Sequence, residues 1–347
     1  MGKDYLVRSF LGIITFSVVV FALEYLSEML IPLVVSVIFA IMFRPLVVIL
    51  SRKKIPTAIS LLIVIIILAF SFYIFGVILY SSSKPLISGL PAYKEKLSQI
   101  IVSALDGLMR IGQTLSINIE NIDIQTLAGA TSYTADALSE TFTTFLNFLG
   151  HTGLVLLFML FMLSGIGSLE AKVKMAYPLE KADRINDALQ NIGRQIRKYI
   201  AVKVLMNGVT GLLTFIALWL LGVDFPVFWG IVAFFVCFIP NIGAVVAIGL
   251  PFIFSLLQFD NFTIPILLII ILGLVYIVMG SLVEPKFMAS TLNLNVLLIL
   301  VALIFWGLVW GPWGMILAVP LTTIIKIIFS NVEPLKPISI LMGSKTE

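Results

Sequence analysis

Charge and chemically reactive side chains are scarce in this sequence. Only 12% of its 347 residues are charged, and it contains one cysteine, Cys237, and one histidine, His151. A soluble protein has about 25% charged residues. A single cysteine excludes a disulfide framework and a cysteine metal cluster, and a single histidine excludes a His-rich metal site. The HExxH and GxSxG motifs are also missing. We therefore expect neither an enzyme nor a cofactor or metal site.

Hydrophobic residues are abundant instead, at 60% of the chain. They gather in long runs: 57–80 and 262–283 carry no charge, and 141–163 is interrupted only by His151. Each run exceeds the about 20 apolar residues that a helix needs to cross a membrane. Lipid offers no partner for backbone amides, and the runs lack the two-residue alternation of a membrane barrel. The sequence therefore predicts an all-α polytopic membrane protein.

Basic loops indicate the orientation of the N-terminal spans, which occupy 1–81. Two apolar segments, 5–25 and 29–50, precede the basic loop at 51–56. By the positive-inside rule, this loop and the N-terminus are cytoplasmic. The first segment lacks a small-x-small cleavage site, so we expect it to remain as a span of the cell membrane. We assign the net charge of +4 to such loops at the lipid surface, not to nucleic-acid binding.

Two polar segments lie between the apolar runs. Residues 82–140 hold four basic and six acidic residues, which favours an extracytoplasmic amphipathic segment. Residues 141–203 combine the return span 141–163 with a basic stretch at 170–203. In that stretch apolar residues repeat at steps of three and four, which predicts an amphipathic helix on the cytoplasmic surface. The expected apolar face is Ile185, Leu189, Ile192, Ile196 and Tyr199.

The C-terminal part, 204–330, contains a span at 204–222 and two hydrophobic pairs that are interrupted by turn-forming residues. If 262–283 crosses inward and places Lys286 in the cytoplasm, both pairs must return to the side from which they enter. We therefore predict two interrupted or re-entrant hairpins, about seven or eight membrane helices in total, and a cytoplasmic tail at 331–347. The arms are 226–238 and 244–257 around the break 239–243, and 296–309 and 315–329 around the break 311–314.

The two breaks are candidate parts of a transport pathway, because freed backbone groups in interrupted helices can bind solutes or ions. Pro240 lacks an N–H group, Asn241 carries an amide that donates and accepts, and Gly243 permits a tight turn. Gly311 and Gly314 occupy the second break. A simple helix kink or a surface turn would use the same residue types, and both alternatives stay open.

Glu284, Pro285 and Lys286 end the uncharged run at 262–283. An ionisable residue beside a membrane segment is a functional candidate, because its burial is costly unless it is paired. Pro285 prevents regular helix continuation, which either brings Glu284 and Lys286 together as a candidate gating or coupling pair or turns both toward one aqueous cavity, with Glu284 as the candidate proton carrier. An interfacial anchor is the alternative. Asp224, just before the first interrupted pair, is either a helix cap or an ion ligand.

Three C-terminal segments resemble the autoinducer-2 exporter (AI-2E) family of membrane proteins. They are FIPNIGAVVAIGLP (238–251), LVEPKFMASTLNLN (282–295) and GPWGMILAVPL (311–321), and Arg44-Pro45 is a weaker echo. The resemblance implies an exporter of autoinducer-2 or another small solute, or a sodium/proton antiporter, and a homo-oligomer. Asn241 stands where relatives often have tyrosine, which separates this chain from the family pattern at the first break.

The sequence and the resemblance together predict a secondary transporter that exports a small polar solute, with a proton or sodium ion as the coupling ion. The expected partners are membrane lipids, a small-molecule or ion substrate and further copies of the chain. Two alternatives stay open: a sodium/proton antiporter and a passive oligomeric channel. Flux that follows an imposed ion gradient separates the transporter from the channel.

Overall fold

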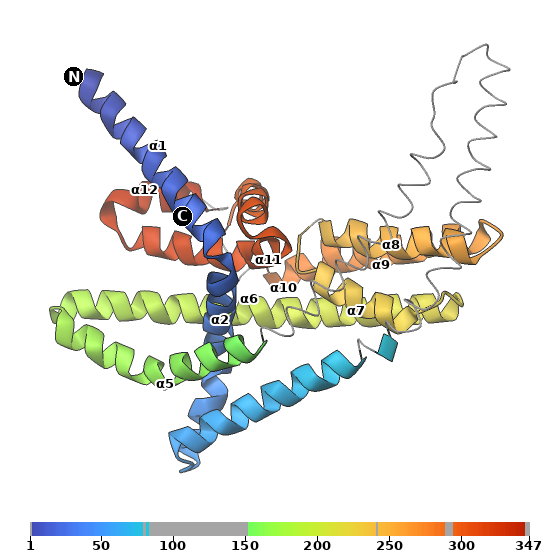
Figure 1. Ribbon diagram of the computed structural model, residues 1–347, viewed down its shortest axis with the longest axis horizontal. Coiled ribbons are helices and arrows are strands. Elements are labelled where there is room, and N and C mark those ends of the chain that lie inside the picture. Colours follow the sequence, from blue (N-terminus) through green and yellow to red (C-terminus); the bar gives the residue numbers. More distant parts are fainter. Residues whose placement is uncertain (1, 79–80, 83–151, 241, 289–293, 344–347) are drawn as a thin grey trace. The chain divides into compact units, whose positions relative to one another are not determined.

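The computed structural model describes residues 2–78, 81–82, 152–240, 242–288 and 294–343. All regular structure in these ranges is helical, which confirms the predicted all-α class (Figure 1). Almost all of the expected extracytoplasmic segment 82–140, the first half of the return span 141–163, and Asn241 lie outside the described residues. Contacts divide the chain into two compact units, and each unit is described by itself below.

Five helices in the described ranges are long and apolar enough to cross a membrane, or six if a bent pair, Thr152–Gly165 with Leu169–Ala176, is counted as one span. The predicted count of seven or eight is not confirmed. The helices on either side of the first break are too short to pass the same test, with 11 and 17 residues. The five are Ser27–Arg52, Thr57–Ile78, Leu179–Leu220, Thr263–Val283 and Val296–Ser330.

The N-terminal spans belong to the first unit, which comprises 1–70, 151–206 and 282–347. Helix α1 (Gly2–Tyr25) and helix α2 (Ser27–Arg52) are separated only at Leu26, between the two predicted apolar segments 5–25 and 29–50. Helix α2 packs against α5 (Thr152–Ala176). Apolar burial is the main source of this contact. The core that these two helices share with the helix Thr57–Ile78 contains Ala40, Val47, Leu61, Val64, Leu68, Met159 and Leu163.

Helix α6 (Leu179–Leu220) is a single helix of 42 residues. The surface helix predicted up to residue 203 and the span predicted from residue 204 are therefore parts of one helix, and residues 170–176 belong to α5. The charge density changes near Lys203, but no proline interrupts the backbone there, so the helix continues. Its buried face differs in part from the expected one, because Leu189 is exposed. Buried positions include Ala182, Asn186, Ile196, Tyr199, Lys203, Asn207, Thr210 and Thr214.

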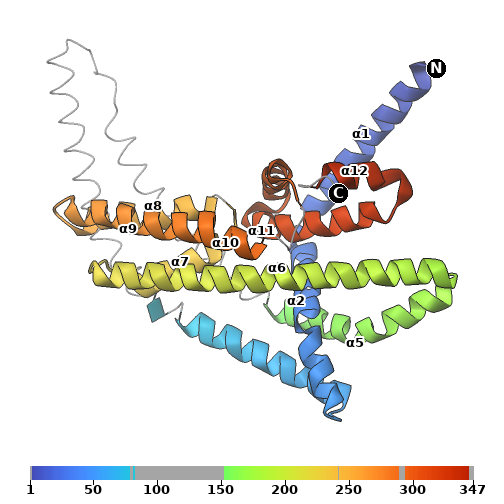
Figure 2. The same cartoon turned by 180° about the vertical axis from the view of Figure 1, so that it is seen from behind.

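The first interrupted pair lies in the second unit, which comprises 71–150 and 207–281. Helix α7 (Pro226–Val236) and helix α8 (Ile242–Gln258) flank the predicted break, which is confirmed. A Cβ atom on Gly243 would overlap the carbonyl oxygen of Val236 and lie 2.7 Å from Cys237 Cα. Only glycine allows this close approach of the two arms. Helix α9 (Thr263–Ile277) packs beside α8, as Figures 1 and 2 show.

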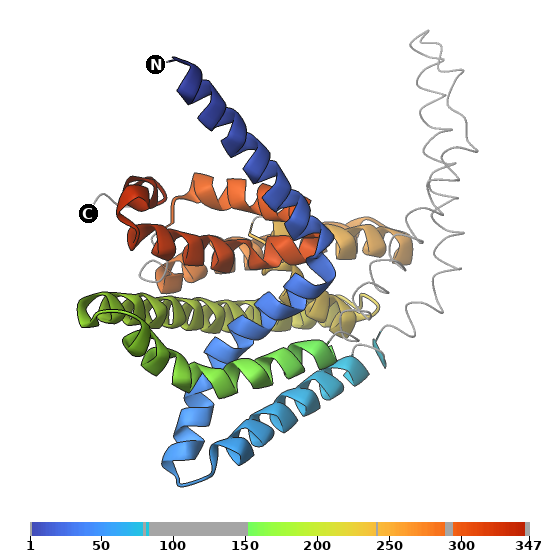
Figure 3. The same cartoon turned by 60° about the vertical axis from the view of Figure 1, so that its left-hand side comes forward.

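The second interrupted pair forms α11 (Val296–Ser330) in the first unit. Gly311 has φ 59° and ψ −143°, so the helix breaks at the predicted position. A Cβ atom on Gly314 would overlap the carbonyl oxygen of Trp306. These residues would be about 12 Å apart along a straight helix. Their contact means that the chain turns sharply between them, and Figure 3 shows the arms as separate helical segments.

Candidate functional site

A buried ion pair joins α6 to the segment that follows α9. The Nζ atom of Lys203 lies 2.6 Å from Oε1 of Glu284, and the two side chains are 5% and 24% exposed. Lys203 lies on the buried face of α6. Glu284 is the first residue of α10 (Glu284–Met288) and follows a π-helical segment, η1 (Val278–Val283). Short π-helical segments are frequent at functional sites, and charges are buried in membrane proteins mainly for function.

The structure corrects the predicted pairing of Glu284 with Lys286. Pro285 is the second residue of α10, a position in the first turn where a helix tolerates proline. The backbone therefore stays helical, and side chains two residues apart do not face each other. Lys286 is exposed, and the carboxylate of Glu284 contacts Lys203 instead.

Tyr199 lies one helical turn before Lys203 on the same buried face of α6. Its side chain is 2% exposed, and its hydroxyl has no hydrogen-bond partner within the described part of the chain. The phenol is close enough to Glu284 for an electrostatic interaction. Its ring packs in a small core with Leu294 and Val319. The segments 282–295 and 311–321, which carry the family resemblance, therefore meet at this face of α6.

Sequence reasoning missed both Lys203 and Tyr199. A signal was present: Lys203 falls four residues after Tyr199, so it lies on the apolar face of the predicted amphipathic helix. A lysine on such a face, just before the uncharged run 204–222, indicates a buried charge that needs a partner. The partner itself lies far away in the sequence.

The predicted pathway residues are divided between the two units. Gly311 and Gly314 belong to the same unit as Glu284, whereas Pro240 and Gly243 belong to the other. At the first break, backbone hydrogen bonds continue across the turn: Ile242 N–H donates to the Pro240 carbonyl (2.7 Å), and Gly243 N–H donates to the Ile239 carbonyl (2.9 Å). At the second, the indole N–H of Trp310 donates to the carbonyl of Leu23 at the end of α1 (2.9 Å).

Asp224 is not the cap of α7. The capping position is Phe225, which has φ 59° and makes no side-chain capping bond. The loop is held instead by Gln258, whose Oε1 accepts from the Asp224 N–H and whose Nε2 donates to the Gly222 carbonyl, both at 2.8 Å. The carboxylate of Asp224 is exposed, and its role as an ion ligand stays a prediction.

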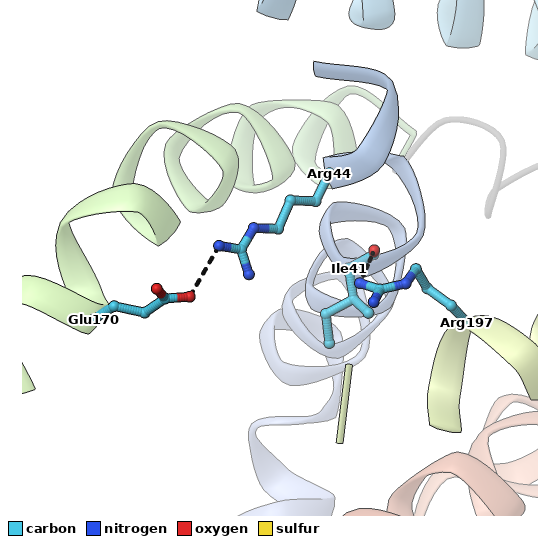
Figure 4. A network of polar contacts seen from close by, with 4 residues as sticks. All are labelled: Ile41, Arg44, Glu170 and Arg197. Atoms are coloured by element: carbon cyan, nitrogen blue, oxygen red, sulfur yellow. Dashed lines mark hydrogen bonds and ion pairs between the residues drawn. The ribbon is translucent and has the colours of Figure 1, made fainter. Parts of the chain in front are cut away.

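A second polar network supports α2 at a proline (Figure 4). Pro45 has no N–H, so the carbonyl of Ile41, four residues earlier, loses its helical donor. Arg197 of α6 donates from Nη1 to this carbonyl at 3.4 Å. Beside it, Arg44 pairs with Glu170 of α5 at 3.1 Å. Arg44-Pro45, the weaker match to the family pattern, therefore lies where side-chain contacts join α2, α5 and α6.

Proteins similar to this chain match almost all of it. The family described as "AI-2E family transporter" matches residues 11–333. A presumed transport protein of Borreliella burgdorferi is 31% identical over 313 residues, which are 90% of this chain and 84% of that protein. The AI-2 transport protein TqsA of Escherichia coli is 29% identical over 334 residues, 94% of this chain and 92% of TqsA. The presumed transport protein YhhT of Escherichia coli is 25% identical over 319 residues, 91% and 88% of the two chains.

Proposed function

The chain belongs to the AI-2E family of membrane transporters, and from this premise we propose that it is a secondary transporter that exports a small polar solute of the AI-2 type. We further propose that it couples export to protons, and that Glu284 is the group that carries the proton. The name of the Escherichia coli relative TqsA supports the solute class. The buried pair of Lys203 and Glu284 supports the coupling.

The ion pair is the observation that carries the proposal. With Glu284 ionised, the pair is neutral as a whole and its charges are 2.6 Å apart. A proton on Glu284 removes one charge and leaves the ammonium of Lys203, which is 5% exposed, without its counter-ion. An uncompensated buried charge costs about 3–5 kcal/mol. Proton binding is therefore linked to a state in which Lys203 and Glu284 have separated, and such a link is what coupled transport requires.

Further features complete the proposal. The basic loop at 51–56 supports a cell-membrane protein with a cytoplasmic N-terminus. Each break supplies non-helical backbone in its own unit, which membranes tolerate where it is enclosed by protein or faces water. Pro240 does so in one unit and Gly311 in the other, and we propose that Asn241, Gly243 and Gly314 beside them belong to the same pathway. A homo-oligomer remains the assembly that the family resemblance implies.

The test is gradient-driven flux in liposomes that contain purified protein. We expect Glu284→Gln to abolish solute movement driven by an imposed pH gradient, because glutamine has a similar shape but binds no proton. Lys286→Gln is the matched control, since it removes an exposed charge outside the pair. Autoinducer-2 and a panel of small polar solutes serve as cargo, and a dye enclosed in the vesicles reports proton movement.

The same assay separates the alternatives. Wild-type flux through Glu284→Gln at matched protein incorporation would refute proton coupling at this residue. Solute flux that ignores every imposed gradient would indicate a passive channel. Proton movement driven by a sodium gradient without solute would indicate an antiporter.

A further inference from the structure

The hydroxyl of Tyr199 is a buried polar group that the ion pair leaves without a partner. Native proteins bond nearly all such groups, so each exception calls for an explanation. Tyr199 is 2% exposed, and the hydroxyl makes no hydrogen bond within the described ranges. Its ring is held by Leu294 and Val319, which limits how far the hydroxyl can move to find a partner.

The position of Tyr199 relative to Lys203 offers the explanation. Four residues separate them, so they lie about 6 Å apart along the same face of α6. Lys203 holds the carboxylate of Glu284 at 2.6 Å, and Tyr199 lies within electrostatic reach of that carboxylate. Two hydrogen-bonding groups on one helix face therefore lie near one carboxyl group, and Lys203 holds it in this structure.

We propose that Tyr199 is the second partner of Glu284, and that its hydroxyl bonds the carboxyl group in the state in which Glu284 has left Lys203. This inference rests on the proposed coupling role of Glu284. In that state the carboxyl group has taken a proton from the aqueous phase, and no proton passes to or from Tyr199. A phenol suits this role because its oxygen both donates and accepts, so it bonds a protonated carboxyl group well.

The two states then differ in which group holds the carboxyl group of Glu284. With the ion pair formed, Lys203 holds it, and the Tyr199 hydroxyl makes no hydrogen bond within the described residues. With Glu284 moved to Tyr199, that hydroxyl is satisfied and Lys203 has lost the carboxylate. Tyr199 thus offsets part of the free-energy cost of separating Lys203 from Glu284. This makes Tyr199 a positioning residue for the coupling step.

The experiment compares Tyr199→Phe with Tyr276→Phe in the full-length protein. Both changes delete one buried hydroxyl and keep the ring. Tyr276 is a matched control because it is 8% exposed and its hydroxyl shares a hydrogen bond with Thr214 at 3.4 Å. In thermal denaturation we expect Tyr276→Phe to lower Tm, since it leaves the Thr214 hydroxyl with one partner fewer. Tyr199→Phe should leave Tm unchanged or raise it, because it removes a polar group that is unbonded in the resting state.

The transport measurement gives the second half of the test. Tyr199→Phe should slow proton-driven export about tenfold, the effect of losing one hydrogen bond to the carboxyl group in the separated state. The KM for the solute should stay the same. A fall in Tm like that of Tyr276→Phe would show that the hydroxyl is already bonded at rest, and would overturn the inference.

Two other results would also overturn it. Wild-type coupled flux in Tyr199→Phe would show that the hydroxyl is idle, and a raised KM with an unchanged coupled rate would place it on the solute. The result for Glu284→Gln separates these failures from failure of the proposed function. If Glu284→Gln abolishes gradient-driven flux and Tyr199→Phe does not, only the role of Tyr199 is lost. If Glu284→Gln transports normally, the coupling role of Glu284 falls first.

Discussion

Removing Lys203 should destabilise the protein far more than removing an exposed lysine or arginine. Lys203→Met keeps the length of the side chain and deletes the ammonium group that lies 2.6 Å from Glu284. Breaking a buried ion pair by removing one partner costs about 3–5 kcal/mol. Glu284 is 24% exposed, so water stabilises the remaining carboxylate in part. We therefore expect a loss near the lower end of that range.

A second variant separates the electrostatic effect from packing. In Lys203→Met/Glu284→Gln both charges are gone, and replacing both members of a buried pair is often close to neutral. The double variant should therefore regain most of the lost stability. Glu284→Gln alone should also be costly, because it leaves the ammonium of Lys203, which is 5% exposed, without the carboxylate; the glutamine carbonyl offsets part of this cost by accepting a hydrogen bond from Lys203.

The assay is unfolding of the purified protein in mixed detergent micelles, followed by circular dichroism. Arg184→Met supplies the control, because Arg184 forms an exposed ion pair with Glu180 at 2.7 Å, with side chains 70% and 82% exposed. Such a pair contributes about 0.3–0.5 kcal/mol. Equal losses in Lys203→Met and Arg184→Met would show that the pair of Lys203 and Glu284 is solvated, and the coupling argument would then lose its basis. The coupling argument would also lose its basis if the double variant lost as much stability as the two single variants lose together.

Two further changes test how the helices are held. Gly314→Ala should lower the unfolding temperature, with an overpacking cost of about 1–3 kcal/mol, since its methyl group would overlap the carbonyl of the preceding arm of α11. Gly249→Ala, at a helical position with no atom within 4 Å, should stabilise by up to about 1 kcal/mol, and a similar loss in both variants would contradict the close approach. Arg197→Met should cost about 1–3 kcal/mol and speed amide exchange in α2, because the carbonyl freed by the proline loses its donor. Unchanged exchange in α2 would show that this carbonyl needs no donor from α6.

The two helix breaks could be predicted because their causes are local. Pro240 and Gly243, and Gly311 with its positive φ, act on the backbone within one turn. The predicted positions are therefore confirmed. Local sequence does not show why glycine is needed at Gly314, however. That reason is the carbonyl of Trp306 on the other arm, which the chain meets only after it has turned.

The continuity of α6 could not be predicted from the charge pattern either. Charged residues end near Lys203, and the sequence therefore suggested two elements, one on the surface and one in the membrane. Helix propagation depends on backbone groups and not on the polarity of the exposed side chains. With no proline between Leu179 and Leu220, one helix contains both the charged and the apolar stretch.

Composition alone determined that this chain is a helical membrane protein, because long apolar runs leave helices as the structure that satisfies every backbone group in lipid. The motifs around Glu284 and Gly311 were sufficient to indicate the family. The partner of Glu284 was decided only by tertiary structure. Lys286 is near in sequence but exposed, whereas Lys203 contacts Glu284 because the buried face of α6 lies against that segment. The energy of an ion pair depends on the distance between its charges in space, and separation along the chain does not predict that distance.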